Sequence, residues 1–91
     1  MKYEVLTTRH FDKALKKCIK RGRDMSKFKD CLDLLAKEGK LPPKYKAHKL
    51  SGTYAGAWEC HLESDWLLIW EQNDSTLTLL MVDIGTHSDI F

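Results

Sequence analysis

The sequence lacks a long apolar run and a cysteine framework, and both absences limit what the protein can be. No stretch approaches the roughly 18 residues of a membrane span, and Lys2, Glu4 and Arg9 interrupt the segment where a signal peptide has its apolar core. The three cysteines are an odd number without C-x-x-C spacing, which argues against a disulfide framework and a zinc ribbon. We therefore expect a soluble, cytoplasmic protein with reduced cysteines.

Basic residues are missing from the whole second half of the chain. All 15 Lys and Arg lie between Lys2 and Lys49, and with six acidic residues in the first 50 positions they give that part a formal charge of +9. Residues 51–91 carry seven acidic residues alone, a charge of −7. This division predicts that the N-terminal half supplies the electric field for a polyanion or for an acidic partner.

The N-terminal half predicts one strand and two helices. Residues 3–6 have the composition of a short strand, and a threonine after them can cap a helix. A second helix is predicted over residues 24–38, between an aspartate cap and Gly39. The first helix is recognised by an apolar stripe at helical spacing, formed by Phe11, Ala14, Leu15, Cys18 and Ile19.

The C-terminal half predicts three strands. The first shows alternating apolar and polar side chains, and the second, residues 66–70, is apolar on both faces, as in a central strand. In the third, residues 76–84, strict alternation places Asp83 on the same face as Met81. The order βααβββ gives an α+β fold in one domain, residues 1–91, with a helical hairpin packed on a small antiparallel sheet.

Histidines are the residues best suited to chemistry in this chain. His48 lies in a basic loop, His61 on the polar side of a strand, and His87 just beyond the last strand, while Asp65 lies in a turn between two of these elements. Short hairpins can bring these groups to one edge of the sheet. Histidine suits proton transfer because its ordinary pKa of about 6.5 leaves both protonation states available near neutral pH. His10, on the first helix, is interpreted as a surface residue.

The same groups do not match a metal site. No H-x₃-H or C-x₂-C element is present, and Cys60 and His61 point to opposite faces of a strand, so they cannot readily share an ion. Cys18 and Cys31 lie in the apolar stripes of the two helices, where small buried side chains are expected. The sequence therefore predicts neither a metal nor a cofactor.

The C-terminal half resembles the YafQ branch of the RelE/ParE toxin superfamily. The resemblance covers residues 48–50 with a turn at Gly52, residues 59–69 and residues 85–91, in the same order and at the same spacing. It implies the α+β fold and an endoribonuclease toxin, an mRNA interferase that cuts messages generally in the ribosomal A site unless a cognate antitoxin holds it. A toxin–antitoxin heterotetramer is one assembly that it implies.

The resemblance also implies roles for individual residues. In this family a ribose 2′-hydroxyl attacks the adjacent phosphate, and no metal is needed. We expect His87 to protonate the departing 5′ oxygen and Asp65 or His48 to remove the 2′-hydroxyl proton, while His61 orients the phosphate or shares a proton. The terminal Phe91 either stacks on a base or packs onto the sheet.

The sequence departs from the family in its cations. Asp83 stands where the family carries an arginine that stabilises charge on the phosphate, and Ala55 and Trp58 replace a lysine and an arginine. We expect Lys46 and Lys49, in the basic loop, to supply the missing charge, since electrostatic stabilisation is often the largest catalytic contribution. Alternatively, the ribosome supplies it, or the protein is a weakened nuclease that mainly binds its antitoxin.

Two functions other than RNA cleavage stay open at this point. A ParE-like toxin has the same fold and inhibits DNA gyrase without chemistry. A binding module would use its basic helices only to engage an acidic antitoxin. The three matched histidines favour the nuclease.

Overall fold

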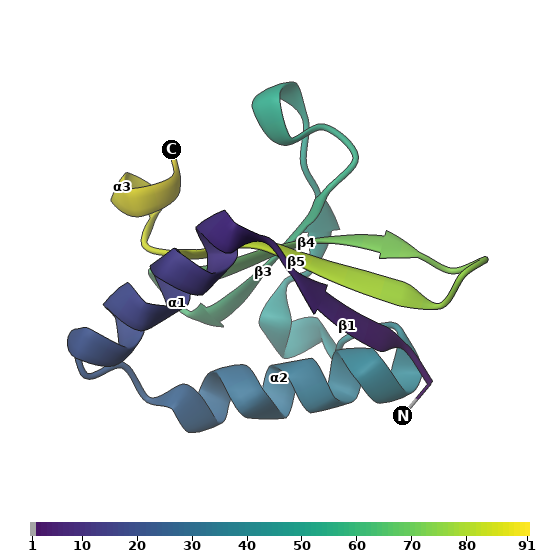
Figure 1. The fold of residues 1–91 in the computed structure, drawn as a ribbon, viewed down its shortest axis with the longest axis horizontal. Helices are drawn as coiled ribbons and strands as arrows, with labels where there is room; N and C mark the ends of the chain where they lie inside the picture. Colours follow the sequence, from purple (N-terminus) through teal and green to yellow (C-terminus); the bar gives the residue numbers. More distant parts are fainter. Residues whose placement is uncertain (1) are drawn as a thin grey trace.

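The computed structural model describes residues 2–91, which form a five-stranded sheet and its flanking helices (Figure 1). The α+β class predicted from the sequence is confirmed, and the structure adds the two-residue strand β2 and the terminal helix α3. The elements, in chain order, are β1 (Glu4–Thr7), α1 (Arg9–Lys20), α2 (Met25–Glu38), η1 (Pro43–Tyr45), β2 (His48–Lys49), η2 (Gly52–Tyr54), β3 (Trp58–Glu63), β4 (Trp66–Asn73), β5 (Thr78–Gly85) and α3 (His87–Ile90).

The sheet has the strand order β1-β5-β4-β3-β2. Strands β2 to β5 pair antiparallel, as tight connections between successive strands require. The prediction of a wholly antiparallel sheet is wrong at β1, which pairs parallel with β5. The reason is topological, because β1 joins its neighbour only through the rest of the chain and no hairpin dictates its direction.

Both predicted helices have the caps that their sequences indicate. The Thr8 side chain accepts a hydrogen bond from the backbone N–H of Phe11 at 3.0 Å and so begins α1. The Asp24 side chain does the same for Ser26 at the start of α2. These caps satisfy amide groups that have no partner within a helix, and they fix where each helix enters the core.

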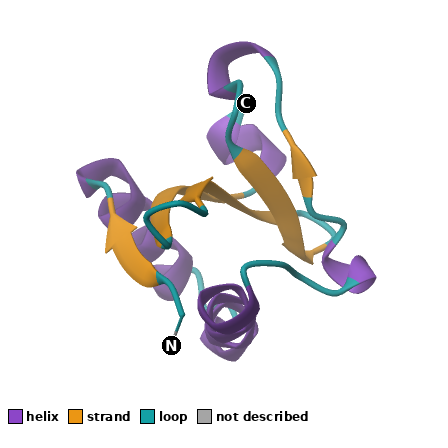
Figure 2. Ribbon diagram, turned by 90° about the vertical axis from the view of Figure 1, so that its right-hand side faces the viewer, coloured by secondary structure: helices purple, strands orange, loops and turns teal. Residues whose placement is uncertain are grey.

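Helices α1 and α2 cover one face of the sheet, and the apolar core lies between these two helices and the strands. Figure 2 shows α2 end-on beneath the strands, while η2 and the C-terminus lie on the other side of the sheet. All three cysteines are buried and free, as predicted for Cys18 and Cys31. Burial of large apolar side chains contributes about 1.5–3 kcal/mol each. The largest ones in this core are Phe11, Leu35, Trp66, Leu68, Trp70, Leu79, Met81 and Ile84.

A β-bulge in β5 exchanges the two faces of the sheet for the side chains that follow it. Ile69 pairs with Asp83, but the next residue of β4, Trp70, pairs with Met81, so Val82 is an extra residue. Beyond it, Asp83 lies on the face away from the helices and Ile84 enters the core. The prediction that Asp83 shares a face with Met81 is therefore wrong, because strict alternation fails where a residue is inserted.

The face away from the helices, which we call the open face, is bordered by two segments. In both ribbon views, η2 and the C-terminal segment rise on the side of the sheet opposite α2 (Figures 1 and 2). The rings of Tyr54 and Phe91 join these segments, with centroids 5.9 Å apart in an edge-to-face arrangement. Among residues 2–91, no helix combines the length and the apolar character needed to cross a membrane.

The end of α2 provides a test of the fold. Gly39 has a left-handed backbone (φ +72°), and a Cβ there would lie 2.5–2.8 Å from the side chain of Tyr3, which is itself buried and hydrogen-bonded to Asp74. We predict that Gly39→Ala lowers the free energy of unfolding by more than the roughly 1–2 kcal/mol that left-handed backbone alone costs a residue with a Cβ.

The matched control is Gly22→Ala, because Gly22 also has a positive φ (+76°) but no atom within 4 Å of the added Cβ. Urea denaturation of both variants measures the difference. Equal losses in the two variants would show that the Tyr3 contact does not constrain this turn.

Candidate active site

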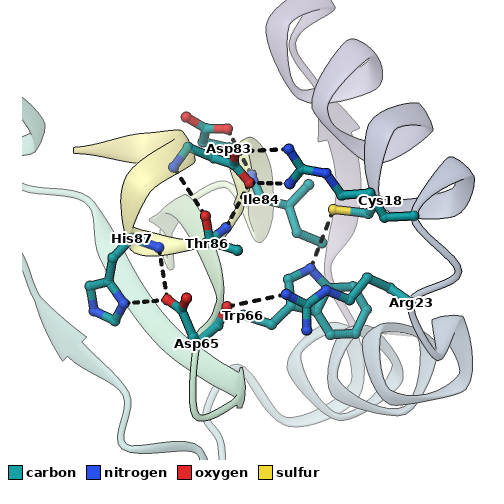
Figure 3. A network of polar contacts seen from close by, with 10 residues as sticks. Cys18, Arg23, Asp65, Trp66, Asp83, Ile84, Thr86 and His87 are labelled. Atoms are coloured by element: carbon teal, nitrogen blue, oxygen red, sulfur yellow. Dashed lines mark hydrogen bonds and ion pairs between the residues drawn. The ribbon is translucent and has the colours of Figure 1, made fainter.

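His87 begins α3 and contacts the turn between β3 and β4. One oxygen of Asp65, Oδ1, accepts the backbone N–H of His87 at 2.9 Å and lies 2.6 Å from the ring Nδ1. The backbone hydrogen bond, followed by that of the ring, lowers the pKa of Asp65 below its ordinary value. The carboxylate is therefore ionised at neutral pH and holds a hydrogen on Nδ1, which leaves Nε2 for a ligand. Figure 3 shows the ring and the carboxylate facing each other.

The short helix that carries His87 is held by Thr86, Asp89 and Arg21. The side chains of Thr86 and Asp89 each accept the other's backbone N–H, at 3.1 and 3.0 Å, in a capping box. The Arg21 guanidinium donates to both oxygens of Asp89, at 2.6 and 3.2 Å, and is the main cause of the lowered pKa of that carboxyl. The terminal segment is thus fastened to the end of α1.

A group of aromatic rings surrounds His87. The ring of His61, on β3, lies 6.1 Å from that of His87, and Phe91 lies 6.5 Å from it on the other side. Within residues 2–91, the ring nitrogens of His61 take part in no hydrogen bond, in contrast to those of His48 and His87. Two imidazoles and one terminal aromatic ring therefore share the same end of the open face.

His48 is engaged at both ring nitrogens. Nδ1 lies 2.9 Å from the carbonyl oxygen of Lys46, and Nε2 lies 3.3 Å from a carboxylate oxygen of Glu59. Both nitrogens of this ring thus face an acceptor oxygen of the protein. Glu59 is only 5% exposed, so this histidine is the polar partner of a buried acid.

Asp83 is the second buried acid of the open face. It is 4% exposed and accepts hydrogen bonds from the backbone N–H of Ile84 at 2.8 Å and from the hydroxyl of Tyr54 at 3.3 Å. Its Oδ2 also lies 3.0 Å from Nε2 of His10, whose side chain is 69% exposed. Burial, with Asp83 adding to it, raises the pKa of Tyr54, so the phenol remains a donor at neutral pH. Each buried acid thus pairs with one histidine.

Lys46 and Lys49 are the two lysines predicted to supply charge to the site. Lys49 places its Nζ 5.7 Å from the ring of Trp58, on the face of the sheet opposite His48. Lys46 has a left-handed backbone (φ 52°) and presents its carbonyl to His48. The structure therefore does not bring Lys49 to the histidines.

Nearly the whole chain matches one family model, which is described as the bacterial toxin of type II toxin–antitoxin system, YafQ, and covers residues 3–91. The chain belongs to the YafQ family. The mRNA interferase toxin YafQ of Escherichia coli is 37% identical over 82 residues, which are 89% of this chain and 87% of that protein.

Solved YafQ structures have the same fold. The crystal structure of YafQ from Escherichia coli has a TM-score of 0.90 at 32% identity and covers 98% of both chains. YafQ in the crystal structure of the Escherichia coli DinJ–YafQ toxin–antitoxin complex has a TM-score of 0.89 at 33% identity, covering 100% of this chain and 99% of that one. The resemblance found in the sequence is therefore confirmed.

Among the residues predicted from the YafQ resemblance, the structure brings His61, Asp65, His87 and Phe91 together. His48 lies on the same open face but is engaged with Glu59. Within the described part of the chain, no group of three or more His, Cys, Asp or Glu has the arrangement of a metal site.

The sequence did not identify three residues of the open face. Glu59 could have been found, because alternation along β3 places it on the side of His61. Tyr54 and His10 gave no such signal, since each reaches Asp83 only through the packing of distant segments. His10, interpreted above as a surface residue, is exposed and also paired.

The contact between Arg21 and Asp89 predicts an acid-sensitive stability. The pKa of Asp89 is lowered in the folded protein, so the pair stabilises the fold above the ordinary Asp pKa of about 3.9 and loses this effect as the pH falls below it. We predict that Arg21→Gln lowers the Tm at pH 7 and that the difference narrows below about pH 4. Thermal unfolding followed by circular dichroism measures it.

The control is Lys20→Gln, which removes a neighbouring charge of the same sign, and it should leave the Tm nearly unchanged. A loss in Arg21→Gln that is independent of pH would contradict the role of this ion pair.

Proposed function

We propose that this chain is an endoribonuclease toxin that cleaves messenger RNA in the cytoplasm and is neutralised by a cognate antitoxin. As a member of the YafQ family it is an mRNA interferase. We propose that the ribosome presents its substrate. The relative solved with DinJ supports a protein antitoxin as the partner. A toxin–antitoxin heterotetramer is the assembly that we propose. The observation that carries the proposal is an imidazole held by an ionised carboxylate on the open face, with a second imidazole beside it.

His87 is proposed as the general acid. Asp65 holds a hydrogen on Nδ1 and stabilises the charged imidazolium, so Nε2 carries the proton that can be donated. Both side chains are more than half exposed, which leaves room for a nucleotide. The proton passes to the 5′ oxygen as the bond between that oxygen and phosphorus breaks.

His61 is proposed as the general base. Asp65 is engaged with His87, and His48 has both nitrogens committed to acceptors, whereas the nitrogens of His61 have no partner within residues 2–91. Its ring lies 6.1 Å from that of His87, which suits one phosphate between them. His61 removes the 2′-hydroxyl proton, the 2′ oxygen bonds to phosphorus, and a 2′,3′-cyclic phosphate and a 5′-hydroxyl result. This reaction requires no change of oxidation state.

Phe91 is proposed to stack on a base beside the scissile phosphate. Its ring is 63% exposed, and Tyr54 supports it edge-on from η2. Stacking of a base on an aromatic ring contributes roughly 1–3 kcal/mol and tolerates any base. The contact therefore orients the nucleotide without selecting a sequence.

The geometry favours cleavage over the two other functions. A gyrase inhibitor or a module that only binds an antitoxin has no use for a solvent-facing carboxylate–imidazole pair next to a second imidazole. The replacement of the family arginine by Asp83 does not remove this pair, because Asp83 lies with His10 and Tyr54.

The first test is expression of His87→Ala in a growing bacterial culture. We predict that the unsubstituted protein arrests growth and fragments translated messages, and that the variant relieves both, since losing general acid catalysis costs about 10²–10⁴-fold in rate. Mapping of message ends after induction measures it. A variant that arrests growth as strongly as the unsubstituted protein refutes the proposed role of His87.

The second test compares two histidines in single-turnover cleavage of a message bound to ribosomes. We predict that His61→Ala lowers the rate by about 10²-fold or more, as loss of a general base requires, and that His48→Ala lowers it less. The acidic limb of the pH–rate profile should flatten only in His61→Ala. The opposite ranking would assign the base to His48.

A further inference from the structure

The open face carries acid–base groups but few cations for a polyanionic substrate. Glu59, Asp65 and Asp83 all lie on or beside it, and Lys49 points to the other face. An RNA strand that places one phosphate between His61 and His87 must also pass its neighbouring phosphates over this surface. The charge that binds them comes from the surrounding elements. Lys27 and Lys44 line a cavity with His61, and Arg23 lies beside Asp65. A further group of basic residues lies on α1 beside β5.

A cavity of about 220 Å³ lies where α1 meets β5 and α3. His10, Lys13 and Lys17 follow one another at helical spacing, so they project from the same side of α1. The lining consists of these three residues with Ala14 on one side, and Asp83, Ile84 and Asp89 on the other.

The two acids of this cavity already have partners. Asp83 holds the imidazole of His10 at 3.0 Å, and Asp89 receives both donors of Arg21. Lys13 and Lys17 form no ion pair with an acid of residues 2–91. The cavity therefore presents two unneutralised ammonium groups and one fixed imidazole, which suits an anion.

A series of side-chain contacts links the cavity to the proposed active site. The ring of His87 lies beside Phe91, Phe91 contacts Tyr54, the Tyr54 hydroxyl donates to Asp83, and Asp83 holds His10. An RNA strand that leaves His87 and follows these side chains reaches the cavity.

We infer that His10, Lys13 and Lys17 bind a backbone phosphate of the RNA that neighbours the scissile one. The inference rests on the proposed function, since it places the scissile phosphate at His87. It adds α1 to the elements that supply cations for the RNA. His10 is available for this role because Asp83, which stands where the family has an arginine, fixes its position.

The test measures RNA binding separately from cleavage. The probe is a fluorescent single-stranded RNA of about 12 nucleotides with every 2′ oxygen methylated, which cannot undergo the reaction. Its Kd is measured by anisotropy between about 50 and 200 mM NaCl for the unsubstituted protein, for Lys13→Gln/Lys17→Gln and for the control Lys16→Gln/Lys20→Gln. The control removes the same charge from the same helix without touching the cavity.

The inference predicts that Lys13→Gln/Lys17→Gln raises the Kd about threefold or more and reduces the steepness of log K against log salt by about 0.7 for each phosphate that the helix no longer neutralises. The control pair should change both quantities much less. Equal effects of the two pairs would reduce the role of α1 to net charge and overturn the inference. Absence of binding by the unsubstituted protein at about 50 mM NaCl would overturn it as well, because a cationic backbone site binds single strands unaided.

His10 has its own test. His10→Ala should weaken binding, and His10→Lys should restore it, because a lysine at this position retains a cation beside Asp83. Equal Kd values for the two variants would remove His10 from the site. Failure of this inference and failure of the proposed function can be told apart. If the unsubstituted protein cleaves messages in cells but its RNA affinity does not depend on α1, only the inference fails. If the unsubstituted protein does not cleave messages, the proposed function fails, whatever the Kd measurements show.

Discussion

The placement of His87 rests on a helix of four residues, and so short a helix has no stability of its own in water. It persists because Arg21 anchors Asp89 and because Asp65 accepts the backbone N–H of His87. The same Asp65 oxygen also orients the imidazole, so one carboxylate fixes both the segment and the ring it carries. The geometry of the proposed acid is therefore tied to the packing of the C-terminus against the end of α1.

The four histidines of the sequence divide into two kinds. His48 and His10 contact Glu59 and Asp83, two acids whose burial without a partner would be costly. Every buried polar side-chain atom in residues 2–91 has a hydrogen-bond partner, so neither buried carboxylate is left without one. The remaining two, His61 and His87, contact no buried acid and are the residues proposed to transfer protons. The division depends on which histidine faces a buried carboxylate, and spacing along the chain does not reveal it.

Local pattern predicted most of the fold and only part of the site. The caps, both helices and the buried cysteines follow from periodicity and from residues such as Thr8 and Asp24, whose effect is confined to one turn. The facing of Asp83 could not be predicted, because an inserted residue in β5 leaves no mark in the composition of the strand. The parallel pairing of β1 and the contact of His10 with Asp83 likewise arise from segments that meet only in the folded chain.

The separation of charge along the chain has a consequence for catalysis. All 15 basic residues precede position 50, and the acid–base groups His61 and His87 follow it, so cations reach the scissile phosphate only through tertiary packing. A cation on α1 that contacts a neighbouring phosphate interacts equally with substrate and transition state, and such uniform binding lowers KM without raising kcat. An arginine on the sheet, by contrast, would contact the charge that develops on the reacting phosphate. With Asp83 in that position, the proposed contacts of α1 supply affinity for RNA but not transition-state stabilisation. That stabilisation has to come from the proposed acid, His87, and from the surface on which the message is held.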